Sequence, residues 1–328
     1  MTEAGLMGIK IISPGLLTTV QDLGRFGYMD SGFSPCGAMD SFSAKLANIL
    51  VDNSEYDGVL EMTMLGITAQ FDEDNIIAIT GAGFEPKING ITVPMNTAVR
   101  INAGDILDCG PAKTGCRGYL SVAGGFDIPL VMGSMSTNLK CKIGGYQGRK
   151  LVAGDVIPLR YPQDRLYAME RRKIDMKTSC DSIKTIHVIL GPQDDYFSDM
   201  GKETFFSEIY KVTAESDRMG IKLDGAPVGA VNGVDIISDG IALGSVQIPS
   251  SGKPIIMMAD RQTTGGYAKI ATVITSDIPL LAQMRPGDAL KFEAVDMEYA
   301  RNRIKADIRI LNKLKDDIIR TDTLLRYV

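Results

Sequence analysis

The stretch Ala103-Gly104-Asp105-Ile106-Leu107 places a glycine–aspartate pair directly before two apolar residues. The pattern returns at 153–157 and at 286–290. In the last of these, Pro286 precedes the glycine. Glycine accepts the positive φ of a tight turn, and Pro-Gly suits a type II turn that leads into a strand. Two such turns in the first half and one in the second predict a mainly β fold with barrel-like β units in two halves. The alternation of long helices and strands that marks a doubly wound sheet is missing.

Two Asn-Gly pairs flanked by β-branched residues support the same fold class. They lie within 87–93 and within 230–237. Asn-Gly readily adopts the positive φ angles of a type I′ turn, so both segments are predicted to form β-hairpins.

Two further segments have helical periodicity. Asp40 can cap a helix over 41–51, and an amphipathic C-terminal helix of roughly 25 residues is predicted from about Asp296. Its apolar positions are Met297, Ala300, Ile304, Ile308, Leu311, Leu314 and Ile318. We expect this helix to pack on its own barrel, and binding to a partner chain is the alternative.

A charged segment divides the chain. Residues 161–182 carry the basic cluster Arg171-Arg172-Lys173, which is typical of a solvated connection. We therefore predict an N-terminal β-barrel half at 1–180, a C-terminal β-barrel half at 181–295 and a helical tail at 296–328.

Composition excludes several partners. The chain of 328 residues has a formal net charge of -5, whereas nucleic acid and anionic membranes both favour a basic patch. No apolar run approaches the roughly 18 residues of a membrane-spanning helix. The N-terminus lacks the basic region and apolar core of a secretory signal, so a cytoplasmic protein is predicted.

No metal site is expected either. None of the five cysteines is spaced as C-x-x-C, and the single histidine, His187, lies in the apolar stretch 185–190. Buried thiols in a reducing cytosol are the favoured interpretation of the cysteines, with a catalytic thiol as the alternative. His187 is predicted to be a strand residue.

Four segments combine polar residues with glycine and could carry chemistry, and they lie at 14–28, 34–40, 217–220 and 260–267. The last follows the apolar strand 255–259. Arg261 could bind a carboxylate or phosphate with two parallel hydrogen bonds, and the threonines and glycine amides could bind an amide oxygen or an oxyanion. A turn with an internal Asp260–Arg261 bridge is the alternative, as is a local ion pair for Asp217-Arg218.

Standard catalytic motifs are absent. The sequence contains no G-x-x-x-x-G-K-[ST], no G-x-S-x-G and no H-E-x-x-H. If ATP is a substrate, this chain does not bind it through a P-loop.

Together the polar segments resemble the family called allophanate hydrolase subunit 2, or KipA-type, also described as the C subunit of 5-oxoprolinase. The matching stretches are PGLLTTVQDLGRFGY at 14–28, SPCGAMDSFSAKLAN at 34–48, LEM at 60–62, TGA at 80–82, GYLSVAGG at 118–125, MGSMST at 132–137, SDRMG at 216–220 and SDGIALGSVQIPSSGKPIIMMADRQTTGGY at 238–267. The charged tail beyond Glu293 departs from the family pattern.

The resemblance implies a cyclophilin-like β-barrel fold. It also implies a complex with a KipI-like B subunit, together with an A subunit for lactam utilisation. That complex would carry out ATP-dependent hydrolysis of 5-oxo-L-proline to L-glutamate, with this chain inactive alone. The family is also similar to the carboxyltransferase part of urea carboxylase. A biotin-dependent carboxyltransferase subunit for urea-like substrates is therefore one alternative, and a regulatory protein that antagonises a KipI-like kinase inhibitor is another.

5-Oxoproline, urea and the biotin ring all present a carbonyl beside an N–H group, so one kind of polar pocket suits them all. Strand ends gather polar loops at a barrel mouth, where we expect 260–267 to lie near 217–218 and 21–25. Asp260 and Arg261 are the predicted catalytic residues. The predicted substrate-binding residues are Gln21, Asp22, Arg25, Asp217, Arg218, Gln262, Thr263, Thr264, Gly265, Gly266 and Tyr267.

Overall fold

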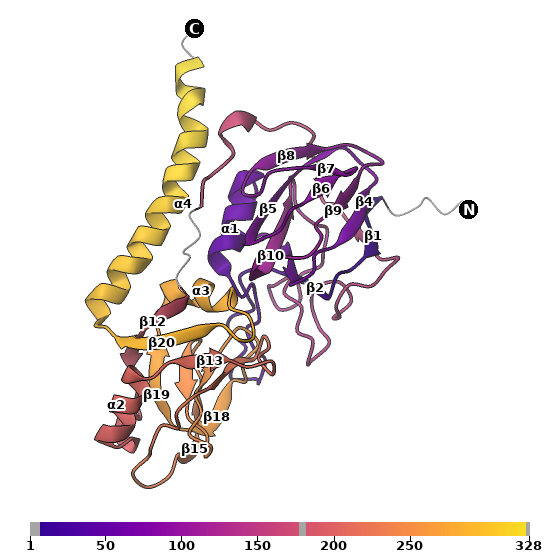
Figure 1. The fold of residues 1–328 in the computed structure, drawn as a ribbon. Helices are drawn as coiled ribbons and strands as arrows, with labels where there is room; N and C mark the ends of the chain where they lie inside the picture. The colour runs from indigo at the N-terminus through magenta and orange to yellow at the C-terminus, as the bar shows by residue number, and fades with distance from the viewer. Residues whose placement is uncertain (1–6, 177–181, 326–328) are drawn as a thin grey trace. The chain divides into compact units, whose positions relative to one another are not determined.

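The computed structural model describes residues 7–176 and 182–325, which form two compact units (Figure 1). Among the described residues, the N-terminal unit comprises 7–25, 36–176 and 308–325, and the C-terminal unit comprises 26–35 and 182–307. The units interleave along the sequence, so the predicted boundaries at 180 and 295 stay predictions. Each unit is described by itself below.

The N-terminal unit is built from two antiparallel sheets with orders β11-β1-β4-β9-β6-β7 and β2-β3-β10-β5-β8. Both sheets contribute to one apolar core, which includes Ile9, Phe71, Leu60 and Leu120. The strands are β1 (Gly8–Ser13), β2 (Leu17–Gln21), β3 (Val59–Thr63), β4 (Thr68–Phe71), β5 (Asn75–Gly83), β6 (Lys87–Ile88), β7 (Ile91–Thr92), β8 (Ala98–Ile101), β9 (Ile106–Asp108), β10 (Thr114–Val122) and β11 (Val156–Pro158).

Strand β5 is buried on both faces. Ile77 and Ile79 belong to the core between the sheets, whereas Ile76 and Ala78 belong to a second core. Side chains alternate along a strand, so one strand can serve two apolar layers. The second core is completed by helix α1 (Ser41–Leu50) and by helix α4 (Met297–Leu325).

Both predicted long helices are present. Helix α1 begins at Ser41, with the Asp40 carboxylate accepting the Ser43 N–H at 2.9 Å as a cap. Leu314 and Ile318 of α4 are buried with Leu46 of α1. The buried side of α4 is narrower than predicted, because Met297 and Ile308 are largely exposed.

The C-terminal unit is a closed barrel with strand order β12-β19-β16-β17-β14-β13-β20. Parallel pairing of β12 with β20 closes it, and the other pairs are antiparallel. The mainly β fold, the barrel and the C-terminal helix confirm the predicted fold class. The elements are β12 (Ile183–Leu190), α2 (Asp199–Ser207), β13 (Tyr210–Val212), β14 (Gly220–Asp224), β16 (Ser245–Gln247), β17 (Ile255–Met257), β19 (Lys269–Val273), α3 (Ile278–Ala282) and β20 (Ala289–Ala294), with a separate two-stranded sheet of β15 (Asp235–Gly240) and β18 (Thr264–Tyr267).

The three Gly-Asp turns share one construction. Gly104, Gly154 and Gly287 all have positive φ angles, of 87, 92 and 94°. The aspartate that follows each glycine accepts the backbone N–H of the residue three positions earlier, in each case at 2.8 Å. The turns lead into β9, β11 and β20, as predicted.

Only one of the two predicted Asn-Gly hairpins forms. Asn89 and Gly90 have φ angles of 49 and 83° and connect β6 to β7. The prediction for 230–237 is wrong, because the residues before the turn pair elsewhere: the Val231 N–H donates to the carbonyl of Tyr196 at 2.9 Å. The residues after it form β15, which pairs with β18.

The expectation of buried cysteines holds for three of the four that the structure describes. Cys36, Cys109 and Cys116 are buried, Cys141 is exposed, and Cys180 lies outside the described residues. Burial, assisted by the charge of Asp108, raises the pKa of Cys109 to about 12, which keeps it a thiol. His187 lies in strand β12, as predicted.

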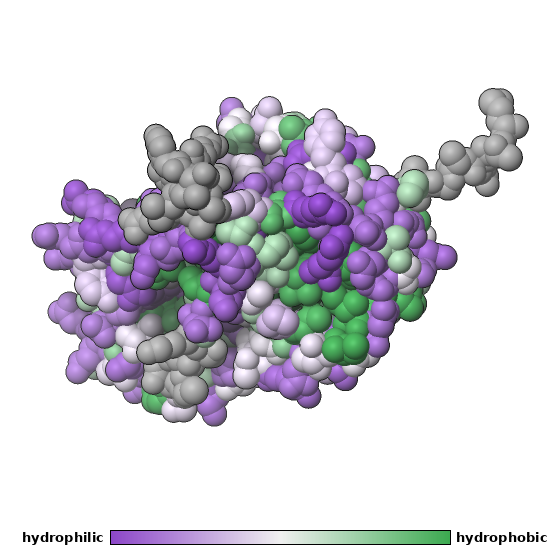
Figure 2. Space-filling model, turned by 90° about the horizontal axis from the view of Figure 1, so that it is seen from above, coloured by the Kyte–Doolittle hydropathy of each residue, from purple (hydrophilic) through white to green (hydrophobic). Residues whose placement is uncertain are grey.

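Hydrophobic side chains also reach the surface. Figure 2 shows hydrophobic residues gathered among hydrophilic ones on one face of the N-terminal unit. The exposed large side chains of this unit include Leu16, Ile91 and Leu130. Across the described ranges, we find no helix with the length and apolarity needed to cross a membrane.

Candidate functional site

The densest predicted segment, 260–267, follows β17 in the C-terminal unit and is held against the residues before β14. The Met258 N–H donates to the carbonyl of Met219, and the Asp260 N–H donates to the carbonyl of Arg218, both at 2.9 Å. These backbone bonds extend the β14–β17 pairing beyond the strands. They place the side chains of Arg218 and Asp260 next to each other.

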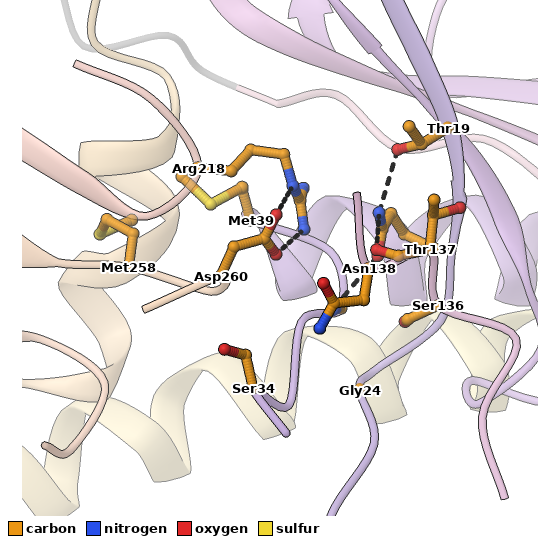
Figure 3. Close-up of polar contacts among 12 residues, drawn as sticks. Thr19, Gly24, Ser34, Met39, Ser136, Thr137, Asn138, Arg218, Met258 and Asp260 are labelled. Carbon is orange, nitrogen blue, oxygen red and sulfur yellow. Dashed lines mark hydrogen bonds and ion pairs between the residues drawn. The ribbon is translucent and has the colours of Figure 1, made fainter. Parts of the chain in front are cut away.

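Arg218 and Asp260 form a two-point ion pair, with Nε to Oδ2 at 2.9 Å and Nη2 to Oδ1 at 2.8 Å (Figure 3). The side chain of Arg218 is 6% exposed and that of Asp260 is 19% exposed. A guanidinium fork that binds both carboxylate oxygens fixes the orientation of the carboxylate. Each oxygen retains a lone pair for a further donor. The pair joins residues 42 positions apart, whereas the sequence had suggested pairing within Asp217-Arg218.

Asp217 has a local role of its own. Its Oδ1 accepts the backbone N–H groups of Met219 at 2.8 Å and Gly220 at 3.1 Å. These bonds shape the turn that presents Arg218.

Arg261 is buried and holds its own loop. Its Nε donates to the carbonyl of Ile241 at 2.9 Å and its Nη1 to that of Met258 at 3.4 Å. Its own carbonyl accepts the hydroxyl of Ser34 at 2.6 Å. The geometry therefore gives Arg261 a positioning role within the loop.

The rest of the loop leads into β18. Gln262 and Thr264 are exposed and Thr263 is half-buried. Gly265 pairs with Asp239 of β15, and a Cβ on it would lie 2.6 Å from the Ile241 side chain. Only glycine fits this close approach without displacing a neighbour.

In the N-terminal unit, Gln21 ends strand β2 with every polar atom of its side chain engaged. Its Nε2 donates to Thr19 Oγ1 at 3.0 Å and to the Thr137 carbonyl at 3.3 Å. Its Oε1 accepts the Gly37 N–H at 3.2 Å.

Asp22, the next residue, is a buried acceptor for four groups. Its carboxylate accepts the backbone N–H of Gly24 at 2.8 Å and of Met135 at 2.6 Å. It also accepts the hydroxyls of Ser134 at 2.7 Å and Ser136 at 2.5 Å. A carboxylate with so many donors is a structural anchor for the 132–137 segment.

Arg25 is fully buried and anchors the same segment. Its Nε donates to the Val131 carbonyl and its Nη2 to that of Ser136, both at 2.8 Å. Asp22 and Arg25 therefore act on any ligand through the segment that they hold.

Ser134 and Ser136 were not among the predicted site residues, although the stretch MGSMST at 132–137 had contributed to the resemblance.

Glu61 was not among the predicted site residues either, although the stretch LEM at 60–62 had contributed to the resemblance. Its buried carboxylate accepts the Met39 N–H at 2.8 Å and the Tyr119 hydroxyl at 2.9 Å. Burial and the charge of Glu61 raise the pKa of Tyr119 well above its ordinary value, so the phenol remains a donor.

The structure thus brings Asp217, Arg218 and the 260–267 loop together in the C-terminal unit. Gln21, Asp22 and Arg25 lie in the N-terminal unit, so a single site formed by both groups stays a prediction. Within the described parts of the chain, no three His, Cys, Asp or Glu side chains converge as metal ligands would.

The chain belongs to the family described as carboxyltransferase domain, subdomain A and B, whose model matches residues 31–294.

Among its relatives, the C subunit of 5-oxoprolinase from Escherichia coli (strain K12) is 37% identical over 292 residues, covering 89% of this chain and 93% of that protein. The protein of the same name from Haemophilus influenzae is 38% identical over 314 residues, covering 95% of this chain and 97% of that protein. Urea amidolyase of Lachancea kluyveri is 32% identical over 96% of this chain, which corresponds to 18% of that longer protein.

Solved structures show the same relationship. Urea amidolyase of K. lactis superposes with a TM-score of 0.87 at 29% identity, covering 95% of this chain and 20% of that chain. The structure of TTHA0988 gives a TM-score of 0.79 at 32% identity, covering 89% of this chain and 56% of that chain.

Proposed function

We propose that this chain is the C subunit of a 5-oxoprolinase complex, which hydrolyses 5-oxo-L-proline to L-glutamate with ATP as a second substrate. The observation that carries the proposal is the near-full-length match to two proteins named as the C subunit of 5-oxoprolinase, at 37% and 38% identity. In those two relatives the match covers nearly the whole protein. In urea amidolyase it covers less than a fifth.

The reaction makes definite demands on a site. A lactam is stabilised by resonance, so opening it requires activation of the carbonyl oxygen, for which phosphorylation by ATP is the expected route. The site must also bind an N–H group and hold a developing negative charge on oxygen.

In the proposed site, Asp260 accepts the N–H of the cyclic amide. Arg218 holds the Asp260 carboxylate in a fixed orientation, and 19% of the Asp260 side chain remains accessible. Thr263 and Thr264 supply hydroxyl donors, and Gly265-Gly266 lets the backbone approach a ligand closely. Arg261 positions this loop by donating hydrogen bonds to the carbonyls of Ile241 and Met258.

Partner chains are part of this proposal. We propose a KipI-like B subunit, together with an A subunit for lactam utilisation, because the names of the relatives describe one member of a set. Hydrophobic residues gathered on one face (Figure 2) are typical of a surface that binds another protein.

One alternative has a specific observation in its favour. The TM-score of 0.87 with K. lactis urea amidolyase fits a carboxyltransferase subunit that acts on urea-like substrates with biotin supplied by another chain. The two functions can be separated by assay. The chain is co-expressed with its candidate partners, and ATP hydrolysis is measured with 5-oxoproline or with urea, bicarbonate and biotinylated carrier. Stimulation by 5-oxoproline alone supports the proposal, and stimulation only by urea with bicarbonate would falsify it.

A further inference from the structure

A pocket of about 470 Å³ opens in the N-terminal unit beside residues 142–148. Its walls are largely apolar and include Ile128, Val131, Ile143 and Tyr146. The volume falls within the range of roughly 300–1,000 Å³ that is typical of small-molecule sites.

Residues 142–148 form the rim of this pocket and are rich in glycine, and the segment around them is basic. Residues 140–150 read KCKIGGYQGRK and contain four basic residues and no acidic one, in a chain whose net charge is -5. Five residues here have positive φ angles: Lys142, Gly144, Gly145, Gln147 and Gly148.

The backbone of this segment presents unused donors. In the part of the chain that the structure describes, the N–H groups of Gly144 and Tyr146 donate to no acceptor. Both residues line the pocket. N–H groups in such a curled backbone can form a concavity that binds anions, although the Gly145 N–H between these two donates to the Met135 carbonyl at 2.8 Å.

A buried cation lies directly behind this rim. Arg25 makes no ion pair with any described residue, and its buried Nη1 has no hydrogen-bond partner. A Cβ on Gly144 would lie 2.5 Å from its Nη2, so the guanidinium lies against the pocket wall. A buried cation without an ion-pair partner favours negative charge nearby, and an anion in the pocket would supply it.

We propose that this pocket binds a nucleoside triphosphate, with its phosphates at the 142–148 rim and its base against the apolar wall. Lys142 pairs with the phosphates, and Arg25 adds positive potential from behind. The single acidic lining residue, Asp127, suits a magnesium nucleotide, because Mg²⁺ in proteins uses one or two carboxylates together with phosphate oxygens. The inference rests on the proposed function, whose reaction uses ATP although the sequence has no P-loop.

The test measures binding of a fluorescent ATP analogue with Mg²⁺ to the full chain, with competition by ATP, tripolyphosphate and 5-oxoproline. We expect saturable binding that ATP displaces. Lys142→Gln should weaken it by about tenfold or more, as for loss of a charged hydrogen bond. Lys140→Gln, in the same segment but outside the lining, is the matched control and should bind normally.

Three outcomes would overturn the inference: absence of saturable ATP binding, equal affinity of the two lysine variants, or competition by 5-oxoproline but not by ATP. Both lysines are exposed, so both variants should fold. Failure here is distinguishable from failure of the proposed function. A complex that hydrolyses ATP in response to 5-oxoproline, while this chain binds no ATP, would reject the pocket alone.

Discussion

The ion pair of Arg218 with Asp260 is the contact on which the proposed site depends. Both partners are largely buried, and removing Arg218 leaves the Asp260 carboxylate without its ion pair. We expect Arg218→Gln to lower the free energy of unfolding by about 3 kcal/mol. Asp260→Asn in the same chain should restore part of that loss. Denaturant unfolding measures both effects.

Lys253 provides the control, because its ion pair with Asp224 lies in the same unit and is largely exposed. Lys253→Gln should change the unfolding midpoint little. Equal effects of the Arg218 and Lys253 variants would show that the Arg218 pair is no more than a surface contact.

Substitutions at Arg261 and Thr263, both in the 260–267 loop, should affect different properties: the first stability and the second activity. Arg261→Ala removes donors from two buried carbonyls and should cost about 1–3 kcal/mol of stability. Thr263→Val should leave thermal stability unchanged and lower kcat/KM of the assembled complex about 3- to 10-fold, as for loss of one neutral hydrogen bond. Normal stability of Arg261→Ala with a large loss of activity would instead make Arg261 a ligand-binding residue.

At the scale of elements, helix α4 is held by the few apolar side chains that it buries, which include Leu311, Leu314 and Ile318. Leu314 is 5% exposed and packs in the second core of the N-terminal unit, whereas Ile319 is 61% exposed. Leu314→Ala should cost about 2–4 kcal/mol through the cavity that it leaves. Ile319→Ala should stay within about 0.5 kcal/mol of the parent. Comparable effects in chemical unfolding would mean that α4 does not pack as described.

The turn before β11 predicts a pH dependence. Burial alone would raise the pKa of Asp155, but hydrogen bonds from Arg149 and the Val152 N–H outweigh it and lower the pKa below the ordinary 3.8. A carboxylate whose pKa is lower in the folded than in the unfolded protein stabilises the fold when the pH is above the unfolded-state pKa. This stabilisation is lost as the pH falls through the folded-state pKa.

Asp155→Asn should therefore cost about 1–2 kcal/mol at pH 7, and the deficit should shrink as the pH falls below about 4. Urea unfolding of both proteins between pH 7 and pH 3.5 measures the difference. A deficit that stays constant or grows in acid would contradict this assignment.

At the scale of the whole molecule, local signals predicted the elements well. The Gly-Asp turns, the Asn89-Gly90 hairpin and both long helices follow from the conformational preferences of a few adjacent residues. Periodicity also explains why α4 is a helix. It did not reveal that its second part belongs to the N-terminal unit, because the apolar side of a helix does not specify what covers it.

The site was harder to predict for a related reason. The segments 217–220 and 260–267 stand out in sequence as polar interruptions between apolar strands. Their ion pair depends on the pairing of β14 with β17, which no local pattern encodes. The roles of Asp22 and Arg25 as anchors depend likewise on Ser136, more than a hundred residues away.

The central claim is that this chain is an essential subunit of an enzyme that opens 5-oxoproline. The most direct measurement is L-glutamate formation from 5-oxoproline and ATP by the reconstituted complex, with and without this chain. The account predicts glutamate formation by the full set of subunits, and none by the chain alone or by the partners without it. Undiminished turnover when this chain is omitted, or turnover by the purified chain alone, would contradict the claim.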